Sequence, residues 1–188
     1  MGRRPATVHG MLLIDKPAGM TSHDVVAGLR KRFGERRIGH AGTLDPDATG
    51  VLVVGVGRAT RLLRFASASF KTYEVEIVLG TETDTLDASG QIVARHQMSV
   101  EKVDVLAAAK GLTGEIQQIP PMVSARRVGG RRLHDLARQG LEVEREARLV
   151  TISRFDIEAT ADSLVWSAVV DCSAGTYIRT LGADLGTA

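Results

Sequence analysis

The sequence predicts an α+β fold with a largely antiparallel or mixed sheet. Segments with the two-residue alternation of strands and segments with helical spacing follow one another without a regular strand–helix–strand repeat. Short turn sequences of the hairpin type join several alternating segments, as at residues 87–90. The last two alternating segments, 149–159 and 164–172, are long and close enough in sequence to pair as antiparallel neighbours.

The N-terminal part predicts a strand followed by a capped helix. Residues 1–9 are expected to form a loose terminus, and the short apolar run at 11–14 is a strand candidate. Thr21 or Ser22 is placed to cap a helix that ends where Gly34 supplies a C-cap. The apolar side chains of this helix recur on one face, so we expect it to cover a core.

A loop, two strands and a short helix are expected next. Residues 39–50 are rich in Gly, Thr, Asp and Pro, a composition typical of loops. The continuous apolar run at 51–56 predicts a buried strand, and a short helix is expected at 60–66. Residues 72–79 alternate between polar and apolar types, which predicts a half-buried strand before the turn at 87–90.

The second half predicts the elements that complete the fold. Ser99 is placed to cap a helix that ends near Gly111, and residues 123–128 are a strand candidate. A tight turn and a short helix are expected within 129–139. The long pair of strands follows, and residues 176–185 are expected to form a final helix.

Composition is that of an ordinary globular domain. Hydrophobic residues make up 44% of the chain and aromatic residues only 4%, so the core must be built mainly from Val, Leu, Ile and Ala. The single cysteine, Cys172, lies on an apolar strand face, where a buried structural thiol is expected. A lone cysteine cannot form an internal disulfide, so a reducing, cytoplasmic compartment is expected. Asp15 and Lys16 interrupt the N-terminal apolar run, so no secretory or membrane segment is predicted.

Arginine is concentrated in two short stretches, 30–37 and 126–132, although the net charge is only +2. A charge this small does not by itself indicate nucleic acid. Basic clusters most often face solvent, but the planar guanidinium also suits phosphates and can stack on bases.

Three common chemistries have little support. The glycines at 55 and 57 lack the third glycine of a dinucleotide site, and no Gly-Lys-Ser/Thr follows them. Asp84 and Asp87 do not have the spacing of a calcium loop, so turn formation accounts better for both, and no metal site is predicted. The Gly-x-Ser-x-Gly elbow of serine hydrolases does not occur.

Asp45 is the candidate for chemistry without a metal or a cofactor. It lies between Leu44 and Pro46 in a loop of small residues, which lets a substrate approach closely, and His40 lies upstream. An ionised carboxylate in such a place can act as a nucleophile or a general base. The local pattern alone favours a plain turn, because Asp-Pro is common in glycine-rich turns.

A series of ordered motifs resembles those of the bacterial tRNA pseudouridine synthase B family. Several motifs in the family's order are far more specific than one, and together they extend over nearly the whole chain. They are LIDKPAGMTS at 13–22, GHAGTLDPDATG at 39–50, KTYE at 71–74, GTETDTLDASG at 80–90, QIPPMVSA at 118–125, LARQG at 136–140 and CSAGTYIR at 172–179.

This resemblance implies roles for individual residues. Asp45 would be the essential aspartate, which attacks the target uridine or assists cleavage of its glycosidic bond. Tyr73 would stack on the flipped base and take part in proton transfer. Arg179 would pair with Asp45, since a nearby guanidinium keeps a carboxylate ionised and oriented. His40 and Tyr177 would contact the substrate nucleotide.

The resemblance also implies a pseudouridine synthase fold, a mixed, mostly antiparallel sheet flanked by helices. Lys16 would support the substrate pocket. The target would be uridine-55 in the T-loop of tRNA, which must leave its stack to react. No cofactor is implied, and we expect a monomer without an obligate protein partner. The side chains expected to bind RNA phosphates are Arg126, Arg127, Arg131 and Arg132.

The family normally continues beyond the motif that contains Arg179. Residues 1–188 are therefore expected to be one catalytic domain that is incomplete at its C-terminus and lacks the C-terminal RNA-binding domain. A second hypothesis is a catalytically impaired module of the same family that binds tRNA or helps it fold. A guide-RNA-dependent relative of the same fold is a third, and it would need protein partners.

Overall fold

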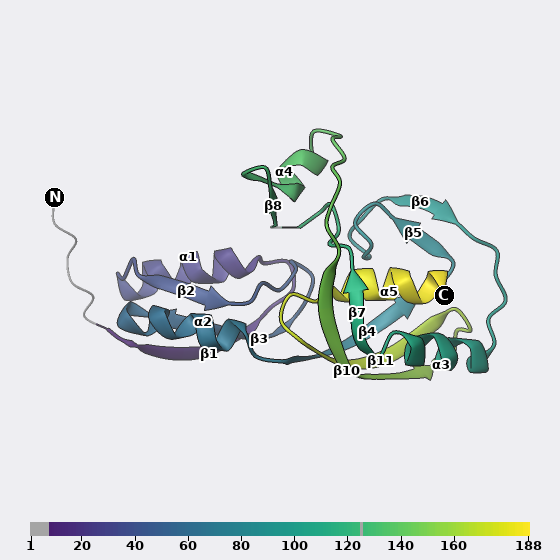
Figure 1. The fold of residues 1–188 in the computed structure, drawn as a ribbon. Helices are drawn as coiled ribbons and strands as arrows, with labels where there is room; N and C mark the ends of the chain where they lie inside the picture. Colours follow the sequence, from purple (N-terminus) through teal and green to yellow (C-terminus); the bar gives the residue numbers. More distant parts are fainter. Residues whose placement is uncertain (1–7, 125) are drawn as a thin grey trace. The chain divides into compact units, whose positions relative to one another are not determined.

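The computed structural model describes residues 8–124 and 126–188, which form two compact units with a boundary between Ser69 and Phe70. Both units combine helices with antiparallel sheets, which confirms the predicted α+β class (Figure 1). Most of the loose terminus expected at 1–9 lies outside the described residues, as does Ala125. Nowhere in the described ranges is a helix both long and apolar enough to cross a membrane.

Unit 1, residues 8–69 of the described chain, is built on a three-stranded sheet in the order β1-β3-β2. The central strand pairs with both neighbours in antiparallel register. Val25 and Val26 of helix α1 pack on one face of the sheet, against Leu52 and Val54. The elements are β1 (Gly10–Lys16), α1 (Ser22–Phe33), β2 (Ile38–Ala41), β3 (Gly50–Val56), the 3-10 helix η1 (Gly57–Leu62) and α2 (Leu63–Ser67).

Local sequence signals define both ends of α1, as predicted. Thr21 is the N-cap, and its hydroxyl accepts a hydrogen bond from the backbone N–H of Asp24 at 3.1 Å. The Asp24 carboxylate accepts in return from the backbone N–H of Thr21 at 2.9 Å. This reciprocal pair satisfies donors that the start of a helix leaves unpaired. Gly34 ends the helix in the left-handed conformation, with φ 61°.

In unit 1, β1 is longer than the strand expected at 11–14, and two further elements begin at other residues than predicted. The loop expected at 39–50 begins only at Gly42, because the residues before it pair with β3 as strand β2. The helix expected at 60–66 is also displaced. Helical structure begins at Gly57 as η1, and α2 follows without a break.

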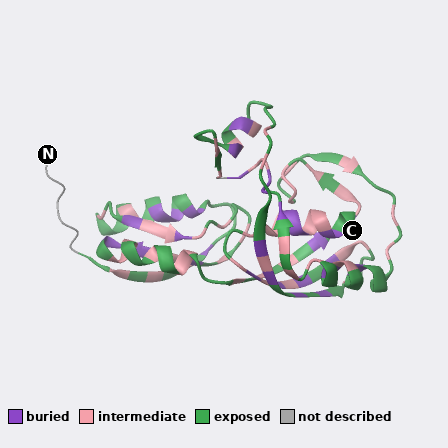
Figure 2. Cartoon of the chain, viewed as in Figure 1, coloured by how far each residue is buried: buried purple, intermediate pink, exposed green. Residues whose placement is uncertain are grey.

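Unit 2, residues 70–188, is built on a four-stranded antiparallel sheet in the order β4-β11-β10-β7. Alternate residues of the central strands, among them Ile152, Trp166 and Val170, form one core. Side chains of helices α3 and α5 belong to the same core. Figure 2 shows this alternation of buried and exposed residues along the sheet. The elements are β4 (Lys71–Val78), α3 (Lys102–Gly111), β7 (Gly114–Gln118), β10 (Arg148–Ala159), β11 (Val165–Cys172) and α5 (Ile178–Thr187).

The long strands of unit 2 confirm the prediction. β10 pairs with β11 with Phe155 opposite Val170, and β4 pairs with the other side of β11 with Tyr73 opposite the same valine. Cys172 is buried at the end of β11 and forms no disulfide. Burial raises the pKa of its thiol, which keeps it neutral and unreactive.

Short elements account for most differences between prediction and structure in unit 2. Helix α3 has Glu101 as its N-cap, so Ser99 does not cap it. The strand expected at 123–128 is limited, within the described residues, to the short strand β8. The short elements are β5 (Thr81–Thr83), β6 (Ile92–Arg95), β8 (Arg127–Val128), β9 (Arg131–Arg132) and α4 (Leu133–Ala137).

Candidate active site

Asp45 lies on the loop that connects β2 to β3 in unit 1, residues 42–49, and it is exposed. Its backbone carbonyl accepts a hydrogen bond from the N–H of Ala48 at 3.1 Å, which closes a turn through Pro46. The turn expected for an Asp-Pro sequence is therefore present, and it carries an accessible carboxylate.

His40 lies in β2 directly before this loop and is half-buried. Its Nδ1 lies within hydrogen-bond distance of the carbonyl oxygen of Gly42. Because a carbonyl only accepts, Nδ1 is the donor in this contact. The contact holds the imidazole at the start of the loop that carries Asp45.

Lys16 ends β1, and its side chain is completely buried, with a relative exposure of 0%. Its ammonium donates hydrogen bonds to the backbone carbonyls of Pro17 at 2.9 Å, Met20 at 2.6 Å and Pro46 at 2.9 Å. Three acceptors match the three N–H donors of a lysine, which offsets part of the cost of burying its charge. The side chain thus ties the turn after β1 to the loop of Asp45.

Tyr73 lies in β4, one of the two edge strands of the four-stranded sheet, and is half-buried. Its side chain is on the same face of the strand as Val75 and Ile77 and packs against the core of unit 2. One side of the ring is therefore fixed by packing while part of its surface stays accessible.

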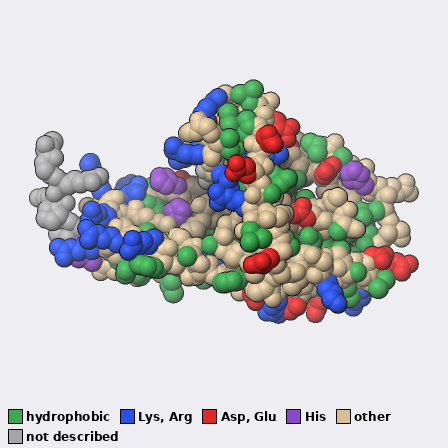
Figure 3. Space-filling view, in the orientation of Figure 1, with side chains coloured by type: hydrophobic (Ala, Val, Ile, Leu, Met, Phe, Trp, Pro, Cys, Tyr) green, Lys and Arg blue, Asp and Glu red, His purple; other side chains and the backbone are tan. Residues whose placement is uncertain are grey.

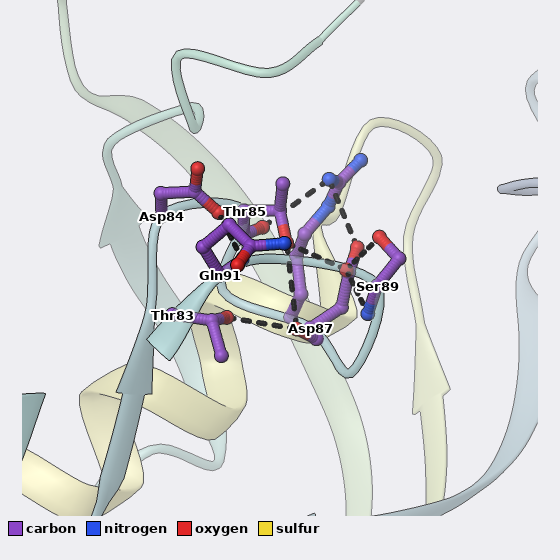
Figure 4. A network of polar contacts seen from close by, with 7 residues as sticks. Thr83, Asp84, Thr85, Asp87, Ser89 and Gln91 are labelled. Carbon is purple, nitrogen blue, oxygen red and sulfur yellow. Dashed lines mark hydrogen bonds and ion pairs between the residues drawn. The ribbon is translucent and has the colours of Figure 1, made fainter. Parts of the chain in front are cut away.

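Arg179 lies in the first turn of α5, and its side chain is only 11% exposed. Its Nη1 donates to the carboxylate of Asp87 at 3.2 Å and to the backbone carbonyl of Thr85 at 3.3 Å (Figure 4). The sequence pattern assigns Asp87 to turn formation alone. The structure confirms that it stabilises a turn and adds the ion pair with Arg179, for which no local signal exists.

The turn between β5 and β6 fixes the carboxylate of Asp87. Its Oδ1 accepts hydrogen bonds from the backbone N–H and the hydroxyl of Ser89 and from the hydroxyl of Thr85. Burial acts to raise the pKa of Asp87, but these hydrogen bonds and the charge of Arg179 outweigh it and hold the pKa below its usual value. Gly90 is needed here, because a Cβ atom would collide with the Thr85 hydroxyl.

Tyr177 is the N-cap of α5 and is held by its backbone. Its N–H donates to Oε1 of Gln118 at 2.7 Å, and its carbonyl accepts from Nε2 of Gln118 at 3.1 Å. Gln118 ends β7 and is only 2% exposed. One buried amide therefore fixes the start of the helix that carries Arg179, a role that the sequence motif around Gln118 does not reveal.

The second arginine cluster lies on the connection between β7 and β10, which we call the arginine arm, residues 126–140. Hairpin β8–β9 and helix α4 of this arm border a groove of about 660 Å³. Lys and Arg side chains gather over the arm in Figure 3. Of the arginines expected to bind phosphates, three line the groove, whereas Arg126 does not. The charged lining residues are Arg127, Arg131, Arg132, Arg138 and Asp135.

The first arginine cluster, at 30–37, is divided by the structure. The guanidinium of Arg30 donates to the carbonyl of Ile38 at 2.8 Å and so connects α1 to β2. The remaining basic side chains of the cluster are exposed, and Figure 3 shows basic side chains gathered over unit 1. The exposed residues are Lys31, Arg32, Arg36 and Arg37.

The residues predicted from the sequence thus form two groups, one in each unit. Among residues 8–124 and 126–188, no group of three or more His, Cys, Asp or Glu side chains is arranged to hold a metal ion. The group in unit 1 is Lys16, His40 and Asp45, and the group in unit 2 is Tyr73, Tyr177, Arg179 and the arginine arm.

The chain is similar to known proteins over most of its length. A family model described as TruB family pseudouridylate synthase, N-terminal domain, matches residues 30–178. The tRNA pseudouridine synthase B of Mycobacterium tuberculosis is 53% identical over 190 aligned residues, which cover 97% of this chain and 63% of the relative. That of Moorella thermoacetica is 53% identical over 184 residues, which cover 95% of this chain and 60% of the relative. The chain therefore spans less than two thirds of the length of these curated relatives.

Solved structures share the fold. A chain in the crystal structure of a Cbf5-Nop10-Gar1 complex aligns with a TM-score of 0.71 and 28% identity, over 95% of this chain and 44% of that one. A chain in an H/ACA RNP bound to a substrate RNA containing 2′-deoxyuridine aligns with a TM-score of 0.66 and 26% identity, over 95% and 42% of the two chains. The expected fold, a mostly antiparallel sheet flanked by helices, is confirmed.

Proposed function

The chain belongs to the TruB family of pseudouridylate synthases, and on this basis we propose that it converts uridine to pseudouridine in tRNA. The target is uridine-55 of the T-loop, and Asp45 is the catalytic aspartate. Tyr73 and Arg179 serve the same reaction, and residues 1–188 act as one catalytic domain.

The family match over 30–178 carries this proposal, because it contains Asp45, Tyr73 and Tyr177. The exposed loop of Asp45 and the buried anchor of Lys16 beneath it add physical support. The reaction needs an accessible carboxylate in a defined position, and hydrogen bonds with Lys16 and Ser22 anchor the loop that carries this one.

The chemistry explains why these residue types suffice. The N1–C1′ bond of uridine breaks, the base rotates, and a C5–C1′ bond forms, while C5 loses a proton and N1 gains one. The reaction involves no net oxidation or reduction, and no external group is added. Asp45 attacks the nucleotide or assists the cleavage, and Tyr73 stacks on the detached base and retains it. His40 and Tyr177 contact the nucleotide.

The arginine arm supplies affinity for the RNA backbone. Four arginine side chains and one carboxylate, that of Asp135, line the groove, so the groove has an excess of positive charge. Arginine binds phosphates through two parallel hydrogen bonds. We assign RNA-phosphate binding to Arg126, Arg127, Arg131 and Arg132, and add Arg138 from the groove.

Tritium release from tRNA labelled at C5 of uridine tests the proposal directly, because C5 loses its hydrogen only when the new bond forms. We expect this chain to release tritium from tRNA alone, without guide RNA or other proteins. Asp45→Asn is expected to abolish release and to leave tRNA binding within about twofold, since it keeps the shape of the side chain and removes the carboxylate. The matched control is Asp47→Asn, which alters an exposed acid of the same loop and should keep activity.

Two other functions predict different results. A tRNA-binding or folding module would bind tRNA and release no tritium. A guide-RNA-dependent enzyme would release tritium only with guide RNA and partner proteins. Full activity of Asp45→Asn would remove Asp45 from its assigned role.

A further inference from the structure

Ser22 is a buried polar residue in contact with the loop of Asp45. It is the first residue of α1 and is only 2% exposed. Its hydroxyl accepts a hydrogen bond from the backbone N–H of Leu44 at 2.9 Å and lies 3.2 Å from the backbone carbonyl of the same residue, to which it donates. A serine hydroxyl has one proton to give and lone pairs to accept, so one side chain satisfies both groups of Leu44. Leu44 directly precedes Asp45.

The residue that follows Asp45 is anchored by the same segment. The carbonyl of Pro46 accepts hydrogen bonds from the backbone N–H of Gly19 and from Nζ of Lys16, both at 2.9 Å. The proline ring fixes its own φ and restricts the backbone of the residue before it. Residues 16–22 therefore anchor the backbone of both residues next to Asp45, Leu44 and Pro46.

We propose that Ser22 is a positioning residue for the reaction, and that it acts through the backbone of Leu44 to hold the Asp45 carboxylate in place. The inference rests on the function proposed for Asp45. With the backbone anchored on both sides, the Cα–Cβ bond of Asp45 has a fixed starting point and direction, which limits the positions that the carboxylate can take before the substrate arrives. The capping box of Thr21 and Asp24 fixes the first turn of α1, and with it the place of Ser22.

A purely structural role makes a different prediction. Buried backbone groups need partners in any protein, so Ser22 could serve the stability of unit 1 alone. In that case its removal would lower the melting temperature and leave the rate of the chemical step unchanged. A positioning role lowers that rate while the affinity for tRNA stays the same.

The experiment compares Ser22→Ala and Ser22→Thr with the control Thr60→Val. The hydroxyl of Thr60 donates to the carbonyl of Gly57 at 2.8 Å, beyond the far end of β3, so the control also removes a side chain-to-backbone hydrogen bond from unit 1. Ser22→Ala is expected to lower the single-turnover rate of tritium release by roughly 10- to 100-fold and to keep the tRNA Kd within about twofold. Ser22→Thr retains a hydroxyl and should recover most of the rate, and Thr60→Val should keep it.

Amide hydrogen exchange at Leu44 tests the hydrogen bond to Ser22 separately from the proposed enzymatic function. Ser22→Ala should speed this exchange by at least about tenfold, and the control should not. A wild-type single-turnover rate in Ser22→Ala overturns the positioning role, as does an equal loss of rate in Thr60→Val. If the wild-type chain releases no tritium, the proposed function is wrong. The exchange rate at Leu44 still shows whether Ser22 anchors the loop of Asp45. Ser22→Cys, with its weak donor, replaces the alanine variant if that variant does not fold.

Discussion

The two carboxylate oxygens of Asp87 have different partners. Oδ1 accepts hydrogen bonds from Thr85 and Ser89 within the β5–β6 turn, whereas Oδ2 faces the guanidinium of Arg179. Replacing Asp87 with asparagine would keep its shape and one oxygen acceptor but would remove the charge opposite Arg179. The change therefore removes one ion pair from an arginine side chain that is only 11% exposed.

We expect Asp87→Asn to lower the free energy of unfolding by roughly 1 kcal/mol at pH 7, allowing for solvent screening. The pKa of Asp87 is lowered in the folded state, so its contribution is present above the unfolded pKa of about 3.9 and is lost as pH falls through the folded pKa. Urea unfolding of both proteins at pH 7 and pH 3 measures this. The difference between them should shrink at pH 3.

The control for this experiment is Glu76→Gln, which removes one charge from an exposed position of β4 and should change stability little at pH 7. A difference between wild type and Asp87→Asn that stays constant from pH 7 to pH 3 would contradict the role of the charge.

The sequence predicts the turn around Asp87 but not the ion pair between Asp87 and Arg179. The spacing of Asp87, Ser89 and Gly90 is local and indicates a turn directly. The contact with Arg179 depends on where α5 packs in unit 2, and no local pattern records that. The same holds for Ser22, which the sequence presents only as a possible helix cap although its hydroxyl bonds to Leu44.

At the scale of elements, the end of β7 determines where α5 begins. Tyr177, the N-cap of α5, has no hydrogen bond from its own side chain to the helix. Gln118 pairs instead with both backbone groups of Tyr177, whose carbonyl also accepts from the N–H of Leu181 at 3.1 Å. Gln118, at the end of β7, thus takes the place of a side-chain cap at Tyr177, which lies two residues before Arg179.

Gln118→Met is expected to lower the free energy of unfolding by roughly 1–3 kcal/mol, because it leaves the N–H of Tyr177 without its partner. Gln118→Glu keeps an acceptor but places a second carboxylate oxygen against the Tyr177 carbonyl. Burial raises the folded pKa of such a glutamate, so this variant should be less stable at pH 8 than at pH 5, where protonation restores a donor.

The matched controls are Gln117→Met and Gln117→Glu, which alter the exposed neighbour on the same strand. Chemical denaturation at both pH values gives the comparison. Equal behaviour of the two positions would show that Gln118 does not hold the start of α5.

Elements with a strong local pattern are predicted well, and those held by partners are not. β10 and β11 alternate over many residues, and α1 has cap residues at both ends, so the sequence reveals each. β2 is short and contains Gly39, which has little strand preference. β2 forms because it pairs with β3. Glycine suits position 39 because a Cβ atom there would lie only 3.2 Å from the Leu63 side chain.

At the scale of the whole chain, a net charge of +2 conceals strong local differences. Pairing of β4, β11 and β10 places acidic side chains on the outer face of the unit 2 sheet, away from its core. The arginine arm of the same unit has the opposite charge. The proposed RNA substrate would therefore be attracted to the arm and repelled by that face, which composition alone could not predict. The acidic residues are Glu74, Glu76, Asp156 and Glu158.

This charge distribution predicts how tRNA binding responds to salt. Each bound phosphate releases counterions, so the slope of log K against log salt concentration should fall by roughly 0.7–0.9 for every phosphate that a variant no longer neutralises. A variant with Arg127, Arg131 and Arg132 changed to alanine should therefore have a slope that is smaller by about 2 to 3. Lys110→Ala removes an exposed charge from α3 and should leave the slope unchanged. Filter binding over a range of salt concentrations measures both.

Changing the same three arginines to lysine separates charge from geometry. Lysine keeps the positive charge, so the salt slope should recover, but it lacks the planar pair of donors that binds one phosphate twice. Affinity at a fixed salt concentration should therefore recover only in part, while the single-turnover rate of tritium release at saturating tRNA stays at the wild-type level. A slope in the triple alanine variant equal to that of Lys110→Ala would mean that the groove of the arginine arm does not contact the RNA backbone.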